Sequence, residues 1–303
     1  MSLRPPLPTP EEIPDVGGET PVPSRAGRNL PAAIAVGVSL AGLILLTIYT
    51  QRILFGVGVV TAAICIAIWE MARAVRSTGV RVPIVPLVAG APVMIAGAYL
   101  HGAAALLAGL VGTILVSLAW LLVAGDRLAL PGGLTSHGLL RDFAATAFIA
   151  LYVPFLAGFA AMLTAPGDGA RRIVAFVLTT AGNDIGGYAA GVLFGKHAMA
   201  PSVSPKKSWE GFAGSVMVCV LLGMLVVGPL LDLERWQGAL YGVAVAATAT
   251  VGDLGESMIK RDIGIKDMGH LLPGHGGLMD RLDSLLVVAP VAWLLLSAWA
   301  PHS

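Results

Sequence analysis

Nine apolar runs divide this chain, and each is long enough to cross a lipid bilayer. At a rise of 1.5 Å per residue, about 20 apolar residues span the hydrocarbon core. Because that core holds no water, each segment must satisfy its own backbone hydrogen bonds, and a helix does so. The sequence therefore predicts an all-α, polytopic integral membrane protein of about nine transmembrane helices. The predicted spans are residues 31–49, 53–71, 83–100, 103–124, 143–164, 172–194, 212–231, 238–256 and 284–300.

Composition excludes several other classes of protein. With 56% hydrophobic and only 12% charged residues, the chain does not resemble a soluble enzyme. It has no basic patch interleaved with aromatic residues, so we expect no nucleic-acid partner. Cys65 and Cys219 both fall inside apolar runs. They are therefore expected to be packing residues and not members of a disulfide or zinc site.

The 303 residues divide into three predicted parts. Residues 1–29 are rich in proline and lack aromatic residues, which predicts a disordered cytoplasmic tail. Residues 30–170 hold the N-terminal transmembrane helices. Residues 171–303 hold the remaining helices and two polar stretches, which makes them the expected catalytic region.

The positions of the basic residues predict the orientation in the membrane. With the N-terminus inside, all but four of the 19 Lys and Arg residues lie in cytoplasmic segments. Both polar stretches then face the cytoplasm. We expect a multi-pass protein of the inner (plasma) membrane with its N-terminus and active site on the cytoplasmic side. The four basic residues on the outer side are Arg52, Arg171, Arg172 and Arg235.

The stretch from Gly252 to Asp283 concentrates charges of both signs in a chain that has few. Acids and bases together with glycines and a proline are what proteins use to hold phosphates and a metal ion. Asp253 and Glu256 are three residues apart and share one helix face, where like charges repel unless a cation or a proton lies between them. A solvated helix end is the alternative interpretation of this pair.

A second polar stretch covers residues 182–214. Asp184 lies within an apolar run, where a carboxylate costs about 2.5–3.5 kcal/mol on insertion scales. We expect it to support a nucleotide or metal site, although a hydrogen bond in helix packing, which Asn183 alone could make, is the alternative. Lys206 and Lys207 fit a phosphate site, and they also fit a simple signal for membrane orientation.

Both stretches resemble the phosphatidate cytidylyltransferases (CDP-diacylglycerol synthases). Every spacing of that family's signature is met, and the resemblance covers roughly residues 180–285. Gly187 and Gly255 depart from the residues expected there, and neither departure touches a charged position. The matching residues are Asp184, Gly186, Gly187, Tyr188, Gly195, Lys196, Ser204, Pro205, Lys206, Lys207, Glu210 and Gly211 in one stretch, and Ser257, Lys260, Arg261, Lys266, Asp267, His275, Gly276, Gly277, Asp280, Arg281 and Asp283 in the other.

The resemblance implies a nucleotidyltransferase of phospholipid biosynthesis. Its reaction would transfer a cytidylyl group from CTP to phosphatidate in the bilayer and yield CDP-diacylglycerol and pyrophosphate. The resemblance also implies dependence on Mg²⁺, leaves open whether a monovalent cation such as K⁺ joins it, and makes a homodimer plausible. Such a site needs relief of repulsion between anions and in-line positioning of the reactants, and it needs no activated serine.

The resemblance and the residue chemistry together assign expected roles to the polar residues. Asp280 and Asp283 also fit a simpler role at the start of the last helix. Acidic side chains at a helix N-terminus interact favourably with the helix dipole and so stabilise the helix. Expected metal ligands are Asp253, Asp280 and Asp283. Expected catalytic residues are these three with Ser257, Lys260, Arg261 and Lys266. Expected substrate-binding residues are Asp184, Lys196, Ser204, Lys206, Lys207, Glu210, Glu256, Asp267, His275, Gly276, Gly277 and Arg281.

Two alternatives remain open at the level of sequence. One is a cytidylyltransferase for another lipid phosphate, because only the apolar wall of the site would differ. The other is an ion-coupled membrane transporter with Asp184 and Asp253 as ion ligands in broken helices. The transporter explains the acids within apolar runs, but it does not explain two long polar stretches on one side of the membrane. The spaced acids of CDP-alcohol phosphatidyltransferases are not found.

Overall fold

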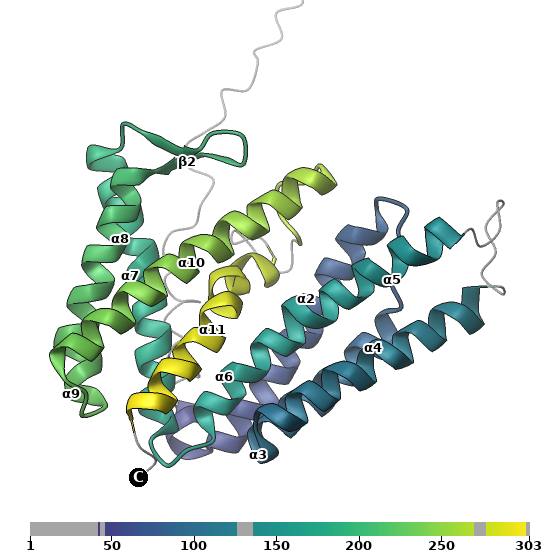
Figure 1. Cartoon of the computed structure of the whole chain (residues 1–303), viewed down its shortest axis with the longest axis horizontal. Coiled ribbons are helices and arrows are strands. Elements are labelled where there is room, and N and C mark those ends of the chain that lie inside the picture. The colour runs from purple at the N-terminus through teal and green to yellow at the C-terminus, as the bar shows by residue number, and fades with distance from the viewer. Residues whose placement is uncertain (1–41, 43–45, 126–135, 270–276, 301–303) are drawn as a thin grey trace, which may run out of the picture.

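Helices make up almost all of the computed structural model, which describes residue 42 and residues 46–125, 136–269 and 277–300 (Figure 1). The expectation of an all-α membrane protein is confirmed, with one small hairpin as an addition. The helices are η1 (Leu54–Val59), α2 (Val60–Arg76), α3 (Ile84–His101), α4 (Ala103–Gly125), α5 (Ser136–Ala150), η2 (Leu151–Phe155), α6 (Leu156–Thr164), α7 (Gly169–Phe194), α8 (Trp209–Leu222), η3 (Gly223–Val227), α9 (Gly228–Leu230), α10 (Arg235–Ile263) and α11 (Met279–Trp299). The strands are β1 (Ala198–Ala200) and β2 (Ser204–Ser208).

Six helical segments of the described residues are long and apolar enough to cross a membrane. Helices α7 and α10 are also long, at 26 and 29 residues, but they carry polar residues of the two polar stretches, among them Asp184 and Asp253. The first predicted span, 31–49, and the predicted tail, 1–29, lie wholly or mostly outside the described residues. The count of nine is therefore not confirmed, and the division into three parts stays a prediction. The six segments are Leu54–Arg76, Ile84–His101, Ala103–Val123, Gly138–Thr164, Trp209–Leu230 and Met279–Trp299.

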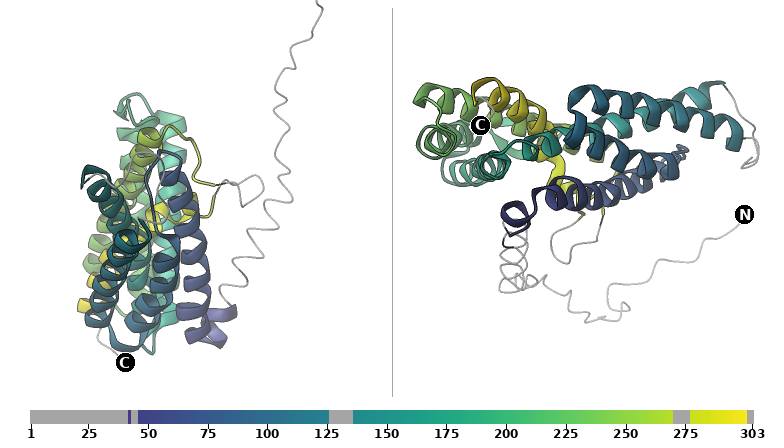
Figure 2. Two further views of the ribbon diagram at one scale, coloured as in Figure 1. Left: turned by 90° about the vertical axis from the view of Figure 1, so that its right-hand side faces the viewer. Right: turned by 90° about the horizontal axis from the view of Figure 1, so that it is seen from below.

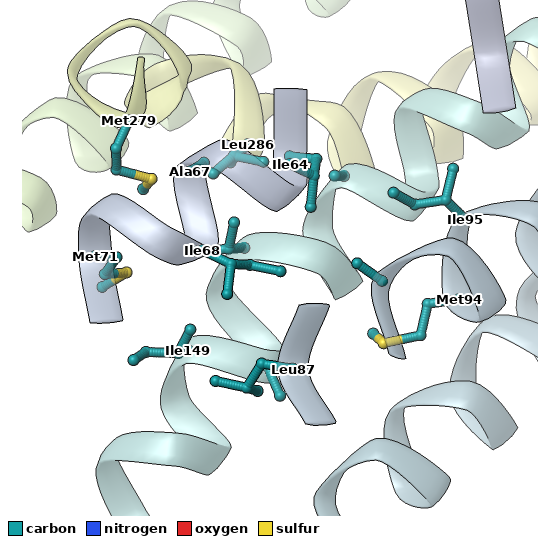
Figure 3. Close-up of a cluster of buried hydrophobic side chains, with 14 of the residues drawn as sticks. Ile64, Ala67, Ile68, Met71, Leu87, Met94, Ile95, Ile149, Met279 and Leu286 are labelled. Atoms are coloured by element: carbon teal, nitrogen blue, oxygen red, sulfur yellow. The ribbon is translucent and has the colours of Figure 1, made fainter. Parts of the chain in front are cut away.

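The helices form two groups that meet at α11. Helices α2 to α6 lie on one side, α7, α8 and α10 lie on the other, and α11 lies between α10 and α6 (Figure 1). The view from below shows the same separation (Figure 2, right). Met279 and Leu286 of α11 pack in one buried cluster with Ile64 and Ile68 of α2 (Figure 3). The start of α11 is thus fixed against the N-terminal group.

Local sequence signals set the ends of the elements around the second polar stretch. The Ser208 side chain accepts a hydrogen bond from the Gly211 N–H and so caps α8. Strands β1 and β2 pair antiparallel, with Ala198 opposite Ser208 and Ala200 opposite Ser204. Because α8 begins directly after β2, the cap holds the hairpin over the end of the helices.

Helix α10 approaches α8 and η3 closely at glycines. A Cβ added to Gly242 would overlap the backbone carbonyl of Cys219, and one added to Gly238 would overlap that of Gly223. Small residues permit this approach between helices in lipid, where packing and not water exclusion drives association. The contact fixes the position of α10, which carries Asp253 and Glu256.

We expect Gly242→Ala to destabilise the protein by roughly 1–3 kcal/mol, because backbone atoms of two helices must move apart. Gly112→Ala in α4 is the matched control, since a Cβ there meets nothing within 4 Å. Thermal unfolding in detergent measures both variants. Equal melting temperatures for the two variants would contradict the close packing.

Candidate active site

A polar pocket of about 440 Å³ lies among α7, α8, the hairpin, α10 and α11. It contains residues from both polar stretches, although these are far apart in the chain. The polar residues that line it are Asn183, Asp184, Tyr188, Ser204, Lys206, Lys207, Ser208, Ser215, Thr250, Asp253, Asp280, Arg281, Asp283 and Ser284. The fold therefore brings the two predicted constellations together at one site.

The hairpin places Lys206 and Lys207 at the pocket. The Lys207 Nζ lies 2.6 Å from the Asp253 Oδ2, and each side chain is 27% exposed. Glu210, at the start of α8, accepts hydrogen bonds from the backbone N–H groups of Lys196 and His197. Glu210 thus fixes the backbone just before β1 of the hairpin. It is not among the residues that line the pocket.

Three carboxyl groups of α10 and α11 lie against one another. The Asp283 carboxyl contacts those of Asp253 and Glu256. Glu256 is only 1% exposed. Carboxylates in contact repel one another unless a proton or a cation lies between them. This cluster therefore needs a shared proton or a bound cation.

Lys260 and Asp280 form the second part of the charged network. The Lys260 Nζ lies 2.8 Å from the Glu256 Oε2 and 2.9 Å from the Asp280 Oδ1. The Asp280 carboxylate also accepts hydrogen bonds from the backbone N–H groups of Met268 and Gly277. Asp280 thus binds described residues on both sides of the gap between α10 and α11.

The predicted metal ligands do not form a complete cage in the part of the chain that the structure describes. There, no three His, Cys, Asp or Glu side chains are placed to hold a metal ion by themselves. Mg²⁺ in nucleotide sites is nevertheless usually held by one or two carboxylates together with substrate phosphates and water. Asp253 and Asp283 fit that arrangement. Two nearby buried oxygens, Asn183 Oδ1 and Glu256 Oε1, have no hydrogen-bond partner among the described residues.

Several predicted site residues lie outside the pocket lining. Lys266 and Asp267 are exposed on the segment after α10, and Ser257 is half-buried on α10. The Arg261 Nε lies 3.4 Å from the Val203 carbonyl oxygen and so contacts the turn of the hairpin. Gly277 is buried beside Asp280. His275 and Gly276 lie outside the described residues, so their roles stay predictions.

The structure also adds polar residues that the motif pattern did not select. Thr250 lies one helical turn before Asp253, and Ser284 directly follows Asp283. Ser215 lies on α8 and donates a hydrogen bond to the Asn183 carbonyl oxygen. The helical spacing from Asp253 could have identified Thr250. Nothing in the sequence alone indicated that α8 would present Ser215 to this pocket.

Comparison with known proteins agrees with the two constellations. The model of the Cytidylyltransferase family matches residues 31–299. The phosphatidate cytidylyltransferase of Mycobacterium bovis is 44% identical over 277 residues, which cover 90% of each chain. The Mycobacterium leprae protein of that name is 45% identical over 281 residues, covering 90% of this chain and 89% of that one. A third protein of that name, from Staphylococcus epidermidis, is 37% identical over 158 residues, which are 51% of this chain and 60% of that one. The chain is therefore a nucleotidyltransferase that belongs to the cytidylyltransferase family.

Proposed function

We propose that this protein transfers the cytidylyl group of CTP to phosphatidate, which gives CDP-diacylglycerol and pyrophosphate in phospholipid biosynthesis. The observation that carries the proposal is the polar pocket, where paired lysines and a carboxyl cluster lie at the ends of membrane helices. The names of the relatives support the same reaction. Family membership in turn argues against the ion-coupled transporter.

The charges of the pocket suit an anionic pair of substrates. CTP carries about four negative charges, and a phosphate monoester carries close to two near neutral pH, since its second pKa is about 6. Lys206, Lys207 and Arg281 line the pocket and supply positive charge. The Asp253 carboxylate holds Lys207 at 2.6 Å and thereby aims its ammonium group into the pocket. These residues would bind the phosphates and reduce the repulsion between the two substrates.

The reaction requires the two substrates to be positioned, and it does not require the attacking oxygen to be activated. An oxygen of the phosphatidate phosphate forms a bond to the α-phosphorus of CTP, and the bond from that phosphorus to the bridging oxygen of the leaving pyrophosphate breaks. The attacking oxygen is already anionic, so no general base is needed. In-line alignment of the two phosphates is the contribution that the protein must make.

We propose Mg²⁺ as the cofactor, with Asp253 and Asp283 as its protein ligands. Mg²⁺ would stabilise the charge on the phosphate oxygens and the leaving pyrophosphate. Asp280 stays a candidate ligand, although its oxygens already accept from Lys260 and two backbone N–H groups. Glu256 and Lys260 would hold Asp283 and Asp280 in place.

An apolar groove on the other flank of α10 suits the lipid. It measures about 320 Å³ and includes Tyr152, Val251, Gly255 and Val287 in its lining. Val251 and Thr250 are neighbours on α10, yet Val251 lines the groove and Thr250 lines the polar pocket. An acyl chain in this groove would therefore lie one helix away from the reacting phosphates. We propose the groove as the acyl-chain site.

The predicted orientation completes the proposal. The pocket would open to the cytoplasm, where CTP is present, while the acyl chains remain in the inner membrane. This placement rests on the distribution of basic residues. The homodimer stays a prediction from the resemblance.

The reaction is tested with purified protein, phosphatidate, Mg²⁺ and CTP labelled at the α-phosphate. We expect label to enter the lipid phase, to stay out of it when EDTA is added, and to stay out when labelled ATP replaces CTP. If label entered another lipid phosphate but not phosphatidate, that other lipid would be the acceptor. No label with any lipid phosphate in a folded preparation would contradict the proposed function.

We expect Asp283→Asn to lower kcat by about 100-fold or more, because it removes one of the two proposed ligand charges. Asp232→Asn is the matched control. Asp232 is exposed in the turn before α10, and its φ of 55° is one that asparagine also adopts. Full activity of the Asp283→Asn enzyme at ordinary Mg²⁺ concentration would remove the role assigned to this carboxylate.

We expect Gly255→Leu to raise the KM for phosphatidate by about tenfold, with CTP binding unchanged, because it fills the groove but not the polar pocket. A Cβ at Gly255 meets nothing within 4 Å, so the helix itself accepts the side chain. Steady-state kinetics with each substrate varied in turn measures the effect. An unchanged KM for phosphatidate would place the acyl chain elsewhere.

A further inference from the structure

Glu70 is a carboxylate inside the apolar helix α2, and neither polar stretch includes it. It is 1% exposed and lies in a helical segment long enough to cross a membrane. A carboxylate at such a place costs several kcal/mol unless it is hydrogen-bonded. Its position therefore calls for a specific partner.

That partner is the first residue of α11. The Met279 N–H donates a hydrogen bond of 2.8 Å to the Glu70 Oε2, across 209 positions of the chain. The first N–H groups of a helix have no partner within the helix, so an acceptor here fixes where α11 begins. An acidic acceptor is also favourable against the helix dipole.

The chain closes tightly around the Glu70 carboxyl group. A Cβ at Gly269 would overlap the Glu70 Oε1, and a Cβ at Gly277 would lie 2.8 Å from the Glu70 Oε2. Both glycines flank the stretch that contains His275 and Gly276. Glu70 thus occupies the space that side chains at these two positions would need.

A second carboxylate, that of Asp280, binds backbone groups of the same segment. Asp280 accepts from the N–H groups of Met268 and Gly277 and pairs with Lys260. Glu70 and Asp280 together bind three backbone N–H groups between residues 268 and 279. Of the two, only Glu70 comes from the N-terminal group of helices.

We propose that Glu70 is a positioning residue for the transfer reaction. It fixes Gly269, Gly277 and the first turn of α11, and through them it sets the placement of Asp280 and Asp283 at the pocket. The inference rests on the proposed function, because its kinetic consequence is a loss of alignment at that site. It also gives the N-terminal helices a role in the reaction beyond anchoring the protein.

Hydrogen–deuterium exchange tests the positioning without reference to activity. Glu70→Leu removes the acceptor at similar volume, whereas Glu70→Gln keeps an acceptor oxygen for the Met279 N–H. The matched control is Asp142→Leu. Asp142 is also a buried carboxylate of the N-terminal group that accepts a backbone N–H, and its partners are Arg81 and Arg141.

We expect Glu70→Leu to speed exchange by at least tenfold in residues 264–269 and 277–282, and Glu70→Gln to speed it much less. Asp142→Leu is expected to leave these residues as in the wild type. Unchanged exchange in Glu70→Leu would overturn the proposal. So would an equal increase in Asp142→Leu, because it would mean general loosening of the fold.

Kinetics then tests the consequence in the full-length protein. We expect Glu70→Leu to lower kcat/KM by about 10- to 100-fold, Glu70→Gln to restore most of it, and Asp142→Leu to leave the KM for CTP unchanged. Faster exchange in Glu70→Leu with wild-type kinetics would overturn the positioning role. A wild-type protein without transfer activity would instead refute the proposed function, and the exchange data would still decide whether Glu70 holds this segment.

Discussion

The Asp280 carboxylate binds donors from three parts of the chain, and the arrangement of the site depends on it. It pairs with the Lys260 Nζ on α10 and accepts from the N–H groups of Met268 and Gly277. Lys260 in turn binds the buried Glu256, whose carboxyl contacts Asp283. Glu256, Lys260 and Asp280 thus each have a partner of opposite charge within the network, which offsets part of the cost of their burial. Asp253 and Asp283 remain the acids best placed for a cation shared with a substrate.

Much of this arrangement could be predicted from the sequence. Apolar runs of bilayer length fixed the all-α fold, because only helices satisfy their backbone in each such run. The spacing of Asp253 and Glu256 predicted that they share one helix face. The polar residues of 182–214 were predicted to belong to the same site. The structure places Asp184, Lys206, Lys207 and Asp253 around one pocket. The family membership agrees with the motif resemblance.

Partners across the fold could not be predicted, because spacing along one helix does not say which other helix faces it. The pairing of Lys207 with Asp253 depends on how the hairpin folds back over α10. Lys266 was expected in the site but is exposed outside the pocket lining. Glu70 was not selected, although a carboxylate in an apolar run carries the same cost that singled out Asp184. The signal was present, but its partner, the Met279 N–H, is a backbone group that no motif shows.

The placement of a cation at the carboxyl cluster is tested most directly by electron paramagnetic resonance of Mn²⁺, used in place of Mg²⁺, with CTP present and no lipid acceptor. We expect wild-type protein to remove the spectrum of free Mn²⁺. The Asp253→Asn and Asp283→Asn double variant should need at least about tenfold more Mn²⁺ for the same effect, because both proposed ligand charges are gone. Equal Mn²⁺ affinity for the two proteins, both folded and both binding CTP, would contradict the account.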